Sequence, residues 1–219
     1  MERASDNGRR AVIFAGGRLG PWALEELRPD DYLIGADSGA DFLLVHGRVL
    51  DLAVGDFDSV PPDRLSRIRD AARETIAVDA VDKDWTDTEL ALREALDRGF
   101  ADIRIAGGLG SRFDHSLANV HLLRQAKERG AQAVLADEYN EIRLCDGKCR
   151  LEADPRYPYV SLLPLTVIVT GVTLDGFRYP LHEATLQLGW SIGISNVLEA
   201  GTGSISLSDG LLLVIRSRD

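Results

Sequence analysis

Residues 11–20 read AVIFAGGRLG, a short run of aliphatic and aromatic side chains that ends directly in a glycine-rich loop. Pro21 follows, and a helical pattern begins at Trp22. A run of this length and composition is typical of a strand buried in a parallel sheet. Proline is a common first residue of a helix, because its fixed φ suits the helix and its missing N–H is not needed there. The segment therefore predicts a strand, a loop and a helix in succession.

The same alternation continues to about residue 135. Further apolar runs are YLIGA from Tyr32, LAVG from Leu52, TIAVD from Thr75, DIRIAG from Asp102 and AVLAD from Ala133. Helical patterns cover residues 22–27, 62–72, 87–98 and 116–129, and the last two end at Gly99 and Gly130. Alternating strands and helices predict an α/β domain, with a doubly wound, mostly parallel sheet that carries helices on both faces.

From about Tyr139 the pattern changes to short apolar runs separated by turn signals, with little helical periodicity. This pattern predicts a smaller all-β domain, a sandwich or partial barrel. The expected boundaries are residues 1–136 for the α/β domain and 137–219 for the β-sandwich domain.

The composition excludes several classes of protein. The chain has 219 residues, and 45% of them are apolar, which is enough for a sizeable core and too many for an intrinsically disordered chain. The net charge is −10, so the surface repels phosphate backbones and nucleic acid is not an expected partner. No apolar segment reaches the ~18 residues of a membrane span, and no secretory signal precedes the first strand. We therefore expect a cytoplasmic protein with no membrane partner.

Two cysteines, Cys145 and Cys149, lie four residues apart in a polar stretch. A tight hairpin would allow them to pair, but one close pair is not a disulfide framework. Further metal ligands at suitable spacing are missing, which argues against zinc. The sequence therefore predicts free thiols in a reducing compartment.

Acidic residues follow three of the predicted strands at their carboxyl ends, where open α/β sheets bind ligands. They are Asp37 after YLIGA, Asp56 and Asp58 after LAVG, and Asp79, Asp82, Asp84 and Asp87 after TIAV. Two like charges ~5 Å apart repel by about 3 kcal/mol at an effective dielectric constant of 20, so such a group calls for a cation. Ligands that are all oxygen favour Mg²⁺. The alternative is that these aspartates cap helices and begin turns, which fits Asp82 and Asp84 equally well.

A second group of polar and glycine residues is GGLGSRFDHSLAN, residues 107–119, between a predicted strand and a helix. The glycines allow a ligand to approach the backbone, the helix N-terminus attracts an anion, and Arg112 adds a phosphate contact. His115 and Asp114 are candidate acid–base groups, although Asp114 alternatively caps a helix beginning near Ser116. The segment is neither a dinucleotide fingerprint nor a Walker loop. Glycines after strands are also common turn formers.

The β domain contributes LGWSIGISN, residues 188–196. An exposed Trp190 would stack on a flat cationic heterocycle, because the face of its ring attracts positive charge. The alternative is a tryptophan in the core.

Five motifs together resemble those of thiamine pyrophosphokinases, in the same order and spacing. They are ADSGAD (36–41), GDFDS (55–59), DKDWTDTELAL (82–92), GGLGSRFDH (107–115) and GWSIGISN (189–196). The resemblance extends from about Ala11 to Arg216. It implies a homodimeric two-domain kinase that transfers a pyrophosphoryl group from ATP to the hydroxyl of thiamine, giving thiamine diphosphate and AMP.

The resemblance also implies roles for individual residues. It assigns Mg²⁺ to Asp37, Asp56, Asp58 and Asp87, with Asp56, Asp58 and Asp87 as catalytic residues. It matches Thr86 and Arg112 to contacts with the ATP phosphates, and Trp190, Ser195 and Asn196 to thiamine, in a pocket completed across the dimer interface. We also expect Asp37, Asp114 and His115 to bind the phosphates. Lys83, where many relatives have glutamine, either adds a positive phosphate contact or is simply solvated. The chain departs from common family residues at Lys83, Ser38 and Asp41, none of which is one of the metal-binding carboxylates.

Two other functions fit parts of the sequence. One is a pyrophosphokinase with a different acceptor, such as a pterin alcohol, because only the β domain bears on the acceptor. The other is a non-catalytic nucleotide sensor or thiamine-binding module, which would not need so many mutually repelling carboxylates. AMP release from ATP and Mg²⁺, with and without thiamine, distinguishes all three.

Overall fold

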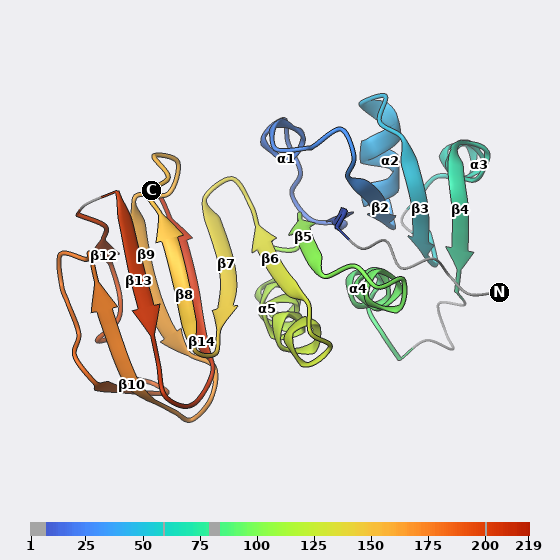
Figure 1. Cartoon of the computed structure of the whole chain (residues 1–219). Helices are drawn as coiled ribbons and strands as arrows, with labels where there is room; N and C mark the ends of the chain where they lie inside the picture. The colour runs from blue at the N-terminus through green and yellow to red at the C-terminus, as the bar shows by residue number, and fades with distance from the viewer. Residues whose placement is uncertain (1–7, 59, 79–83, 200) are drawn as a thin grey trace. The chain divides into compact units, whose positions relative to one another are not determined.

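The computed structural model describes residues 8–58, 60–78, 84–199 and 201–219, so Asp79, Asp82 and Lys83 lie outside the described residues. The chain divides into two compact units, Met1–Glu138 and Tyr139–Asp219 (Figure 1). Each unit is described separately below.

The first unit is built on a parallel sheet. Its described strands are β1 (Arg10–Phe14), β2 (Tyr32–Ala36), β3 (Leu50–Gly55), β4 (Ala72–Ala77), β5 (Asp102–Ala106) and β6 (Gln132–Ala136). They lie in the order β6-β5-β1-β2-β3-β4, and every neighbouring pair is parallel. All five residues of the central strand β1 are buried, as its apolar sequence predicts. The strand predictions are correct to within a few residues.

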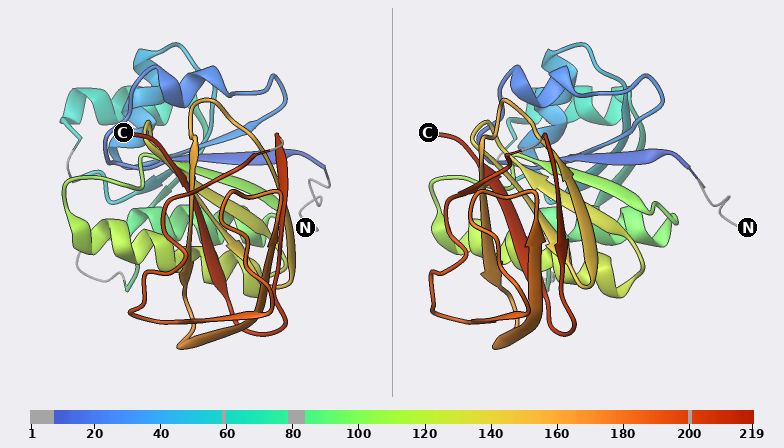
Figure 2. Two further views of the ribbon diagram at one scale, coloured as in Figure 1. Left: turned by 90° about the vertical axis from the view of Figure 1, so that its left-hand side faces the viewer. Right: turned by 60° about the vertical axis from the view of Figure 1, so that its left-hand side comes forward.

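Helices cover both faces of this sheet. They are α1 (Trp22–Glu25), α2 (Ser38–Val45), α3 (Pro62–Ala71), α4 (Asp87–Asp97) and α5 (Phe113–Glu128). Figure 2 shows α1, α2 and α3 on one face and α4 and α5 on the other. The arrangement confirms the predicted doubly wound fold. No described helix is long and apolar enough to cross a membrane.

Two helices differ from the sequence predictions. Helix α2 was not predicted from the sequence, in which Gly39 resembles a turn former. In the structure Gly39 lets α2 approach β1 closely, because a Cβ at this position would lie 1.9 Å from the carbonyl oxygen of Phe14. Helix α5 begins at Phe113 rather than near Ser116, so Arg112 and not Asp114 is its N-cap residue. The first turn of α5 therefore lies closer to the glycine loop than the sequence indicates.

The order of the strands reverses at β1. The chain adds β2, β3 and β4 on one side of β1 and then returns to place β5 and β6 on the other. The loops after β1 and β5 therefore leave the sheet in opposite directions at this point, which is where open α/β sheets bind ligands. Here the backbone N–H of Gly17 donates to the carbonyl oxygen of Gly107 at 3.0 Å. A Cβ on Gly17 would lie 2.2 Å from that oxygen, so the contact requires glycine.

The second unit is a β-sandwich, as predicted. Its strands are β7 (Asn140–Cys145), β8 (Lys148–Glu152), β9 (Tyr159–Pro164), β10 (Ile168–Asp175), β11 (Ala184–Gln187), β12 (Asn196–Val197), β13 (Thr202–Ser206) and β14 (Leu212–Ser217). Within this unit they form two antiparallel groups, β12-β9-β14-β7 and β11-β10-β13-β8. Buried residues from both groups, among them Leu162, Val172, Leu174, Ile205 and Val214, make up one core.

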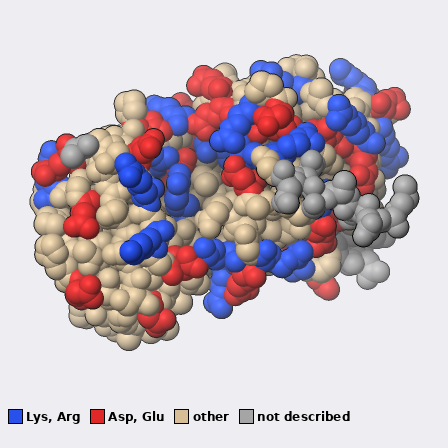
Figure 3. Space-filling model, in the orientation of Figure 1, with Lys and Arg blue, Asp and Glu red and all other residues tan. Residues whose placement is uncertain are grey.

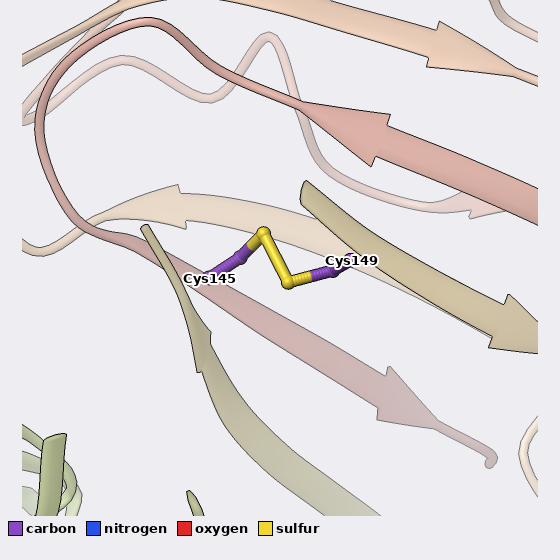
Figure 4. Close-up of a disulfide and its surroundings, with 2 residues drawn as sticks. All are labelled: Cys145 and Cys149. Carbon is purple, nitrogen blue, oxygen red and sulfur yellow. A yellow bond between two sulfur atoms is a disulfide. The ribbon is translucent and has the colours of Figure 1, made fainter. Parts of the chain in front are cut away.

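The prediction of free thiols was wrong. Cys145, the last residue of β7, and Cys149, the second position of β8, form a disulfide (Figure 4). The short turn between the strands brings their Cα atoms to 6.0 Å, which is a normal separation for a disulfide. The tight turn that the two thiols need in order to pair does form between β7 and β8, so the lack of other cysteine pairs did not count against a disulfide.

A buried ion cluster lies at one end of the sandwich. The carboxylate of Glu141 is only 4% exposed and is contacted by the guanidinium groups of Arg143 and Arg216. The Nε of Arg216 donates to Glu141 Oε1 at 3.0 Å. Burial raises the pKa of Glu141, but the two arginines outweigh it, so that the pKa lies below the ordinary value of 4.5. A lowered pKa in the folded state stabilises the fold at pH values above the unfolded-state pKa, and this contribution is lost as the pH falls.

We expect Glu141→Gln to lower the free energy of unfolding at pH 7 by about 3 kcal/mol or more, because it leaves two partly buried guanidinium groups without their counter-charge. The difference from wild type should be smaller at a pH of about 3 than at pH 7, because the charge of wild-type Glu141 is progressively lost as the pH falls. Urea unfolding at both pH values measures this, with exposed Glu183→Gln, away from these arginines, as the control. A difference of equal size at the two pH values would contradict the assignment.

Candidate active site

Three carboxylates meet at the carboxyl edge of the parallel sheet. Asp37 follows β2, and Asp56 and Asp58 follow the neighbouring strand β3. One oxygen atom from each lies within 4.8 Å of the other two. Carboxylates this close repel one another strongly unless a cation lies between them. Among the described residues, this group is therefore a candidate cation site whose ligands are all oxygen atoms.

The backbone holds these carboxylates in an uncommon conformation. Asp37 has φ of 50° and Phe57, which separates Asp56 from Asp58, has φ of 58°. The ring of Phe57 is buried in the core, and Asp56 Oδ1 accepts a hydrogen bond from the backbone N–H of Asp58 at 3.1 Å. Residues other than glycine adopt positive φ only where the surrounding structure compensates for the strain. The anchored Phe57 ring thus fixes the turn that carries both carboxylates.

A fourth carboxylate, that of Asp87, approaches the same edge from helix α4. Thr86 is the N-cap residue of this helix, and its Oγ1 accepts a hydrogen bond from the backbone N–H of Glu89 at 3.2 Å. A Cβ on Gly55 would lie 3.2 Å from Asp87 Oδ1 and 3.3 Å from the backbone N of Asp37. Gly55 therefore leaves a space that is bordered by Asp87 Oδ1 and by the backbone of Asp37. The Thr86 cap fixes the start of the helix whose first residue is Asp87.

A cavity of about 330 Å³ adjoins the carboxylates. Its lining comes from the loops after β1 and β5 and from the first turns of α4 and α5, and Asp37 belongs both to this lining and to the carboxylate group. The lining residues include Gly16, Gly17, Gly107, Gly108, Gly110, Thr86, Asp87, Arg112 and His115. Glycine backbone and a helix N-terminus provide N–H donors and a positive dipole, which suit a phosphate group.

Asp114 has a different position from the other predicted phosphate ligands. Arg112 and His115 line the cavity, whereas Asp114 is exposed and is not among the lining residues. Arg112 Nη2 donates to Asp114 Oδ2 at 2.9 Å, and His115 Nε2 lies 3.8 Å from the same oxygen. The hydrogen bond from Arg112 is the main reason why the pKa of Asp114 lies below its ordinary value. Asp114 thus acts as a partner of Arg112.

Four polar residues of the cavity were not singled out from the sequence: Thr88, Ser111, Ser116 and Asn119. The amide of Asn119 donates to the carbonyl oxygen of Gly108 at 2.7 Å, and Ser116 Oγ accepts from the backbone N–H of Gly110 at 3.0 Å. Both side chains are buried and hold the glycine loop against α5. Their spacing of three residues places them on one face of a helix, which is the signal that would have revealed them.

The predicted thiamine residues lie in the second unit. Trp190 is 61% exposed, so it is not a core residue. Ser195 has φ of 59°, and its backbone N–H donates to Ser161 Oγ at 3.0 Å. The buried side-chain amide of Asn196 donates to the carbonyl oxygen of Tyr179 at 2.7 Å and accepts from its N–H at 3.1 Å. Asn196 therefore fixes the end of the loop that carries Trp190.

Glycine loops and carboxylates at a reversal of strand order are typical of α/β proteins that bind phosphorylated small molecules at this edge. Two family models match the chain: the catalytic domain of thiamin pyrophosphokinase over residues 24–135, and its vitamin B1 binding domain over residues 148–212. The chain belongs to the thiamin pyrophosphokinase family, as the sequence motifs indicated.

Individual relatives agree with this membership. A thiamine pyrophosphokinase of Bacillus subtilis (strain 168) is 37% identical over 187 residues, which cover 85% of this chain and 87% of the relative. The crystal structure of thiamine pyrophosphokinase from Bacillus subtilis is 34% identical with a TM-score of 0.88, covering 96% of this chain and 99% of that one. The structure from Geobacillus thermodenitrificans is 33% identical with a TM-score of 0.86, covering 96% and 98%.

We expect Gly55→Ala to lower the free energy of unfolding by about 1–3 kcal/mol, because φ at this position is 144° and a Cβ would press on Asp37 and Asp87. Gly110→Ala is the matched control, since a Cβ at that position would have no atom within 4 Å. Urea unfolding of the two variants measures the difference. An equal loss in both would show that the space at Gly55 is not needed.

Proposed function

We propose that this chain transfers the pyrophosphoryl group of ATP to the hydroxyl of thiamine, forming thiamine diphosphate and AMP. Family membership supports the reaction class. The observation that carries the proposal for the site is the double position of Asp37, which lies in the carboxylate group and also lines the glycine-rich cavity. A triphosphate in that cavity would have its phosphate oxygens beside the carboxylates.

Mg²⁺ is the cation that these residues fit best. Asp37, Asp56 and Asp58 offer oxygen ligands alone, and Asp87, which is outside that group, lines the adjoining cavity. Bound by these carboxylates, Mg²⁺ would neutralise the negative charge of the phosphate groups. It would also offset the repulsion among the carboxylates.

The remaining residues of the cavity would hold the phosphates in position. The N–H groups of the glycine loops and the first turn of α5 would donate to phosphate oxygens, and Arg112 would exchange Asp114 for a phosphate. The thiamine hydroxyl oxygen would attack the β-phosphorus of ATP. The bond between the β-phosphorus and the oxygen that joins it to the α-phosphorus would break, so that AMP leaves, and the hydroxyl proton would pass to a base. Asp58, which is exposed, and Asp87 are the two candidates for that base. Catalysis is then mainly positioning and charge neutralisation.

The second unit would bind thiamine. The exposed ring of Trp190 offers a face to the cationic heterocycle, and Ser195 offers its hydroxyl. The neighbouring residues Leu188, Ile192 and Ile194 are also exposed. We further propose that a second copy of the chain covers these apolar side chains in a homodimer, which the molecular mass in solution tests.

We expect Asp56→Asn and Asp58→Asn each to lower the turnover number roughly 100-fold or more, since each removes a charged ligand of the cation. AMP formation from ATP and Mg²⁺, with and without thiamine, is the measurement. Exposed Asp84→Asn, outside the carboxylate group, is the control and should keep wild-type activity. Near-normal AMP formation by both site variants would contradict the assignment of Asp56 and Asp58 as cation ligands. AMP formation that does not depend on thiamine would contradict thiamine as the acceptor.

We expect Trp190→Ala to raise the KM for thiamine roughly 2- to 30-fold, which is the loss of affinity expected when a cation–π contact is removed. The KM for ATP should change little. Trp190→Phe should restore part of the loss, because it retains an aromatic face. Steady-state kinetics with each substrate varied in turn measures both constants. Equal thiamine KM values for the alanine variant and wild type would exclude stacking on Trp190.

A further inference from the structure

A second cavity, of about 480 Å³, lies in the second unit. It is lined by Arg143, Arg150, Leu151, Glu152, Ala153, Asp154, Pro155 and Arg216. Its volume falls within the usual range for small-molecule sites. None of these residues has a role in the proposed reaction. Figure 3 shows Lys and Arg side chains among Asp and Glu side chains on the visible face of this unit, although the whole chain carries a net charge of −10.

Two of the arginines are held firmly by the protein. Arg143 and Arg216 both contact the buried carboxylate of Glu141, and Arg216 Nη1 also donates to the carbonyl oxygen of Glu152 at 3.2 Å. The side chain of Arg216 is only 11% exposed. Guanidinium groups fixed in this way lose little conformational entropy when an anion binds, so that the site is organised in advance.

Donors remain at the cavity after these contacts are made. The side chain of Arg143 is 32% exposed and lines the cavity, although its Nε is buried and cannot itself reach a ligand there. The guanidinium of Arg150 makes no ion pair or hydrogen bond with any described residue. An oxyanion in the cavity would accept charge-assisted hydrogen bonds from Arg150 and would lie beside the positive charge of Arg143.

The balance of charge also favours an anion. Asp154 is neutralised by Arg156, whose Nη2 donates to Asp154 Oδ2 at 2.6 Å. Glu141 lies beneath the cavity between its arginines, and Glu152 is the remaining acidic side chain of the lining. The three positive charges of the lining arginines therefore outnumber the two negative charges of Glu141 and Glu152 by one.

We propose that this cavity, termed the Arg150 cavity, is a binding site for a phosphate group. The planar guanidinium of Arg150 matches the oxygens of a phosphate, and Arg143, which also lines the cavity, adds a second positive charge. The shared chemistry is a tetrahedral oxyanion, either inorganic phosphate or one end of a diphosphate. The site consists of residues of the second unit alone, and its occupancy does not depend on the proposed reaction.

Calorimetric titration with inorganic phosphate and, separately, with inorganic pyrophosphate tests the site at constant ionic strength without Mg²⁺. The full-length Arg112→Gln variant serves as the background, because it weakens anion binding at the candidate active site. We expect saturable binding in this background and a loss of roughly tenfold or more in affinity when Arg150→Gln is added. Lys148→Gln, on the same strand but outside the cavity, should leave the affinity unchanged.

If pyrophosphate binds more tightly than phosphate, the site is assigned to one end of a diphosphate. If phosphate binds more tightly, the site is assigned to inorganic phosphate. Either result supports a phosphate site. Three results would overturn it. The first is that neither anion gives saturable heat in the Arg112→Gln background. The second is that adding Arg150→Gln leaves the anion affinity unchanged. The third is that Lys148→Gln lowers the affinity as much as Arg150→Gln does. The AMP-release assay is separate, so failure of this site and failure of the proposed reaction are distinguishable.

Discussion

The first unit depends on the close approach of two backbones where the order of its strands reverses. The loops after β1 and β5 touch through Gly17 and Gly107, at a distance that excludes any side chain on Gly17. This contact closes one wall of the cavity and leaves N–H groups in its lining. The carboxylates of the neighbouring strands then border a space that the sheet itself creates. The chemistry of the site follows from this arrangement of the backbone.

The carboxylate group carries a cost that the rest of the unit has to offset. Like charges repel at these distances, and Asp37 and Phe57 also adopt left-handed backbone conformations. A buried aromatic ring, a capped helix and a glycine with φ of 144° keep the carboxylates in place. Strain and repulsion that persist in a folded protein are typical of a site that binds a cation.

Much of the fold follows from local sequence patterns. Short aliphatic runs locate the strands of the first unit, and because parallel strands end at one edge, they also place Asp37 beside Asp56 and Asp58. Helix α2 was missed because Gly39 serves a close contact between helix and strand, which a single sequence does not reveal. The disulfide was missed for a related reason: the distance between Cys145 and Cys149 depends on the shape of a turn. The spacing of Ser116 and Asn119 places them on one face of a helix, but their partners are backbone atoms of the glycine loop, which a sequence pattern does not identify.

The exposed pair formed by Arg112 and Asp114 has a consequence for selectivity. The guanidinium of Arg112, which lines the cavity, already donates a hydrogen bond to Asp114, so an anion that binds there competes with a carboxylate two residues along the chain. A weak monovalent anion gains little from that exchange, whereas a polyanion with several simultaneous contacts gains enough to displace it. Asp114 would in this way serve as an internal competitor that screens out common small ions.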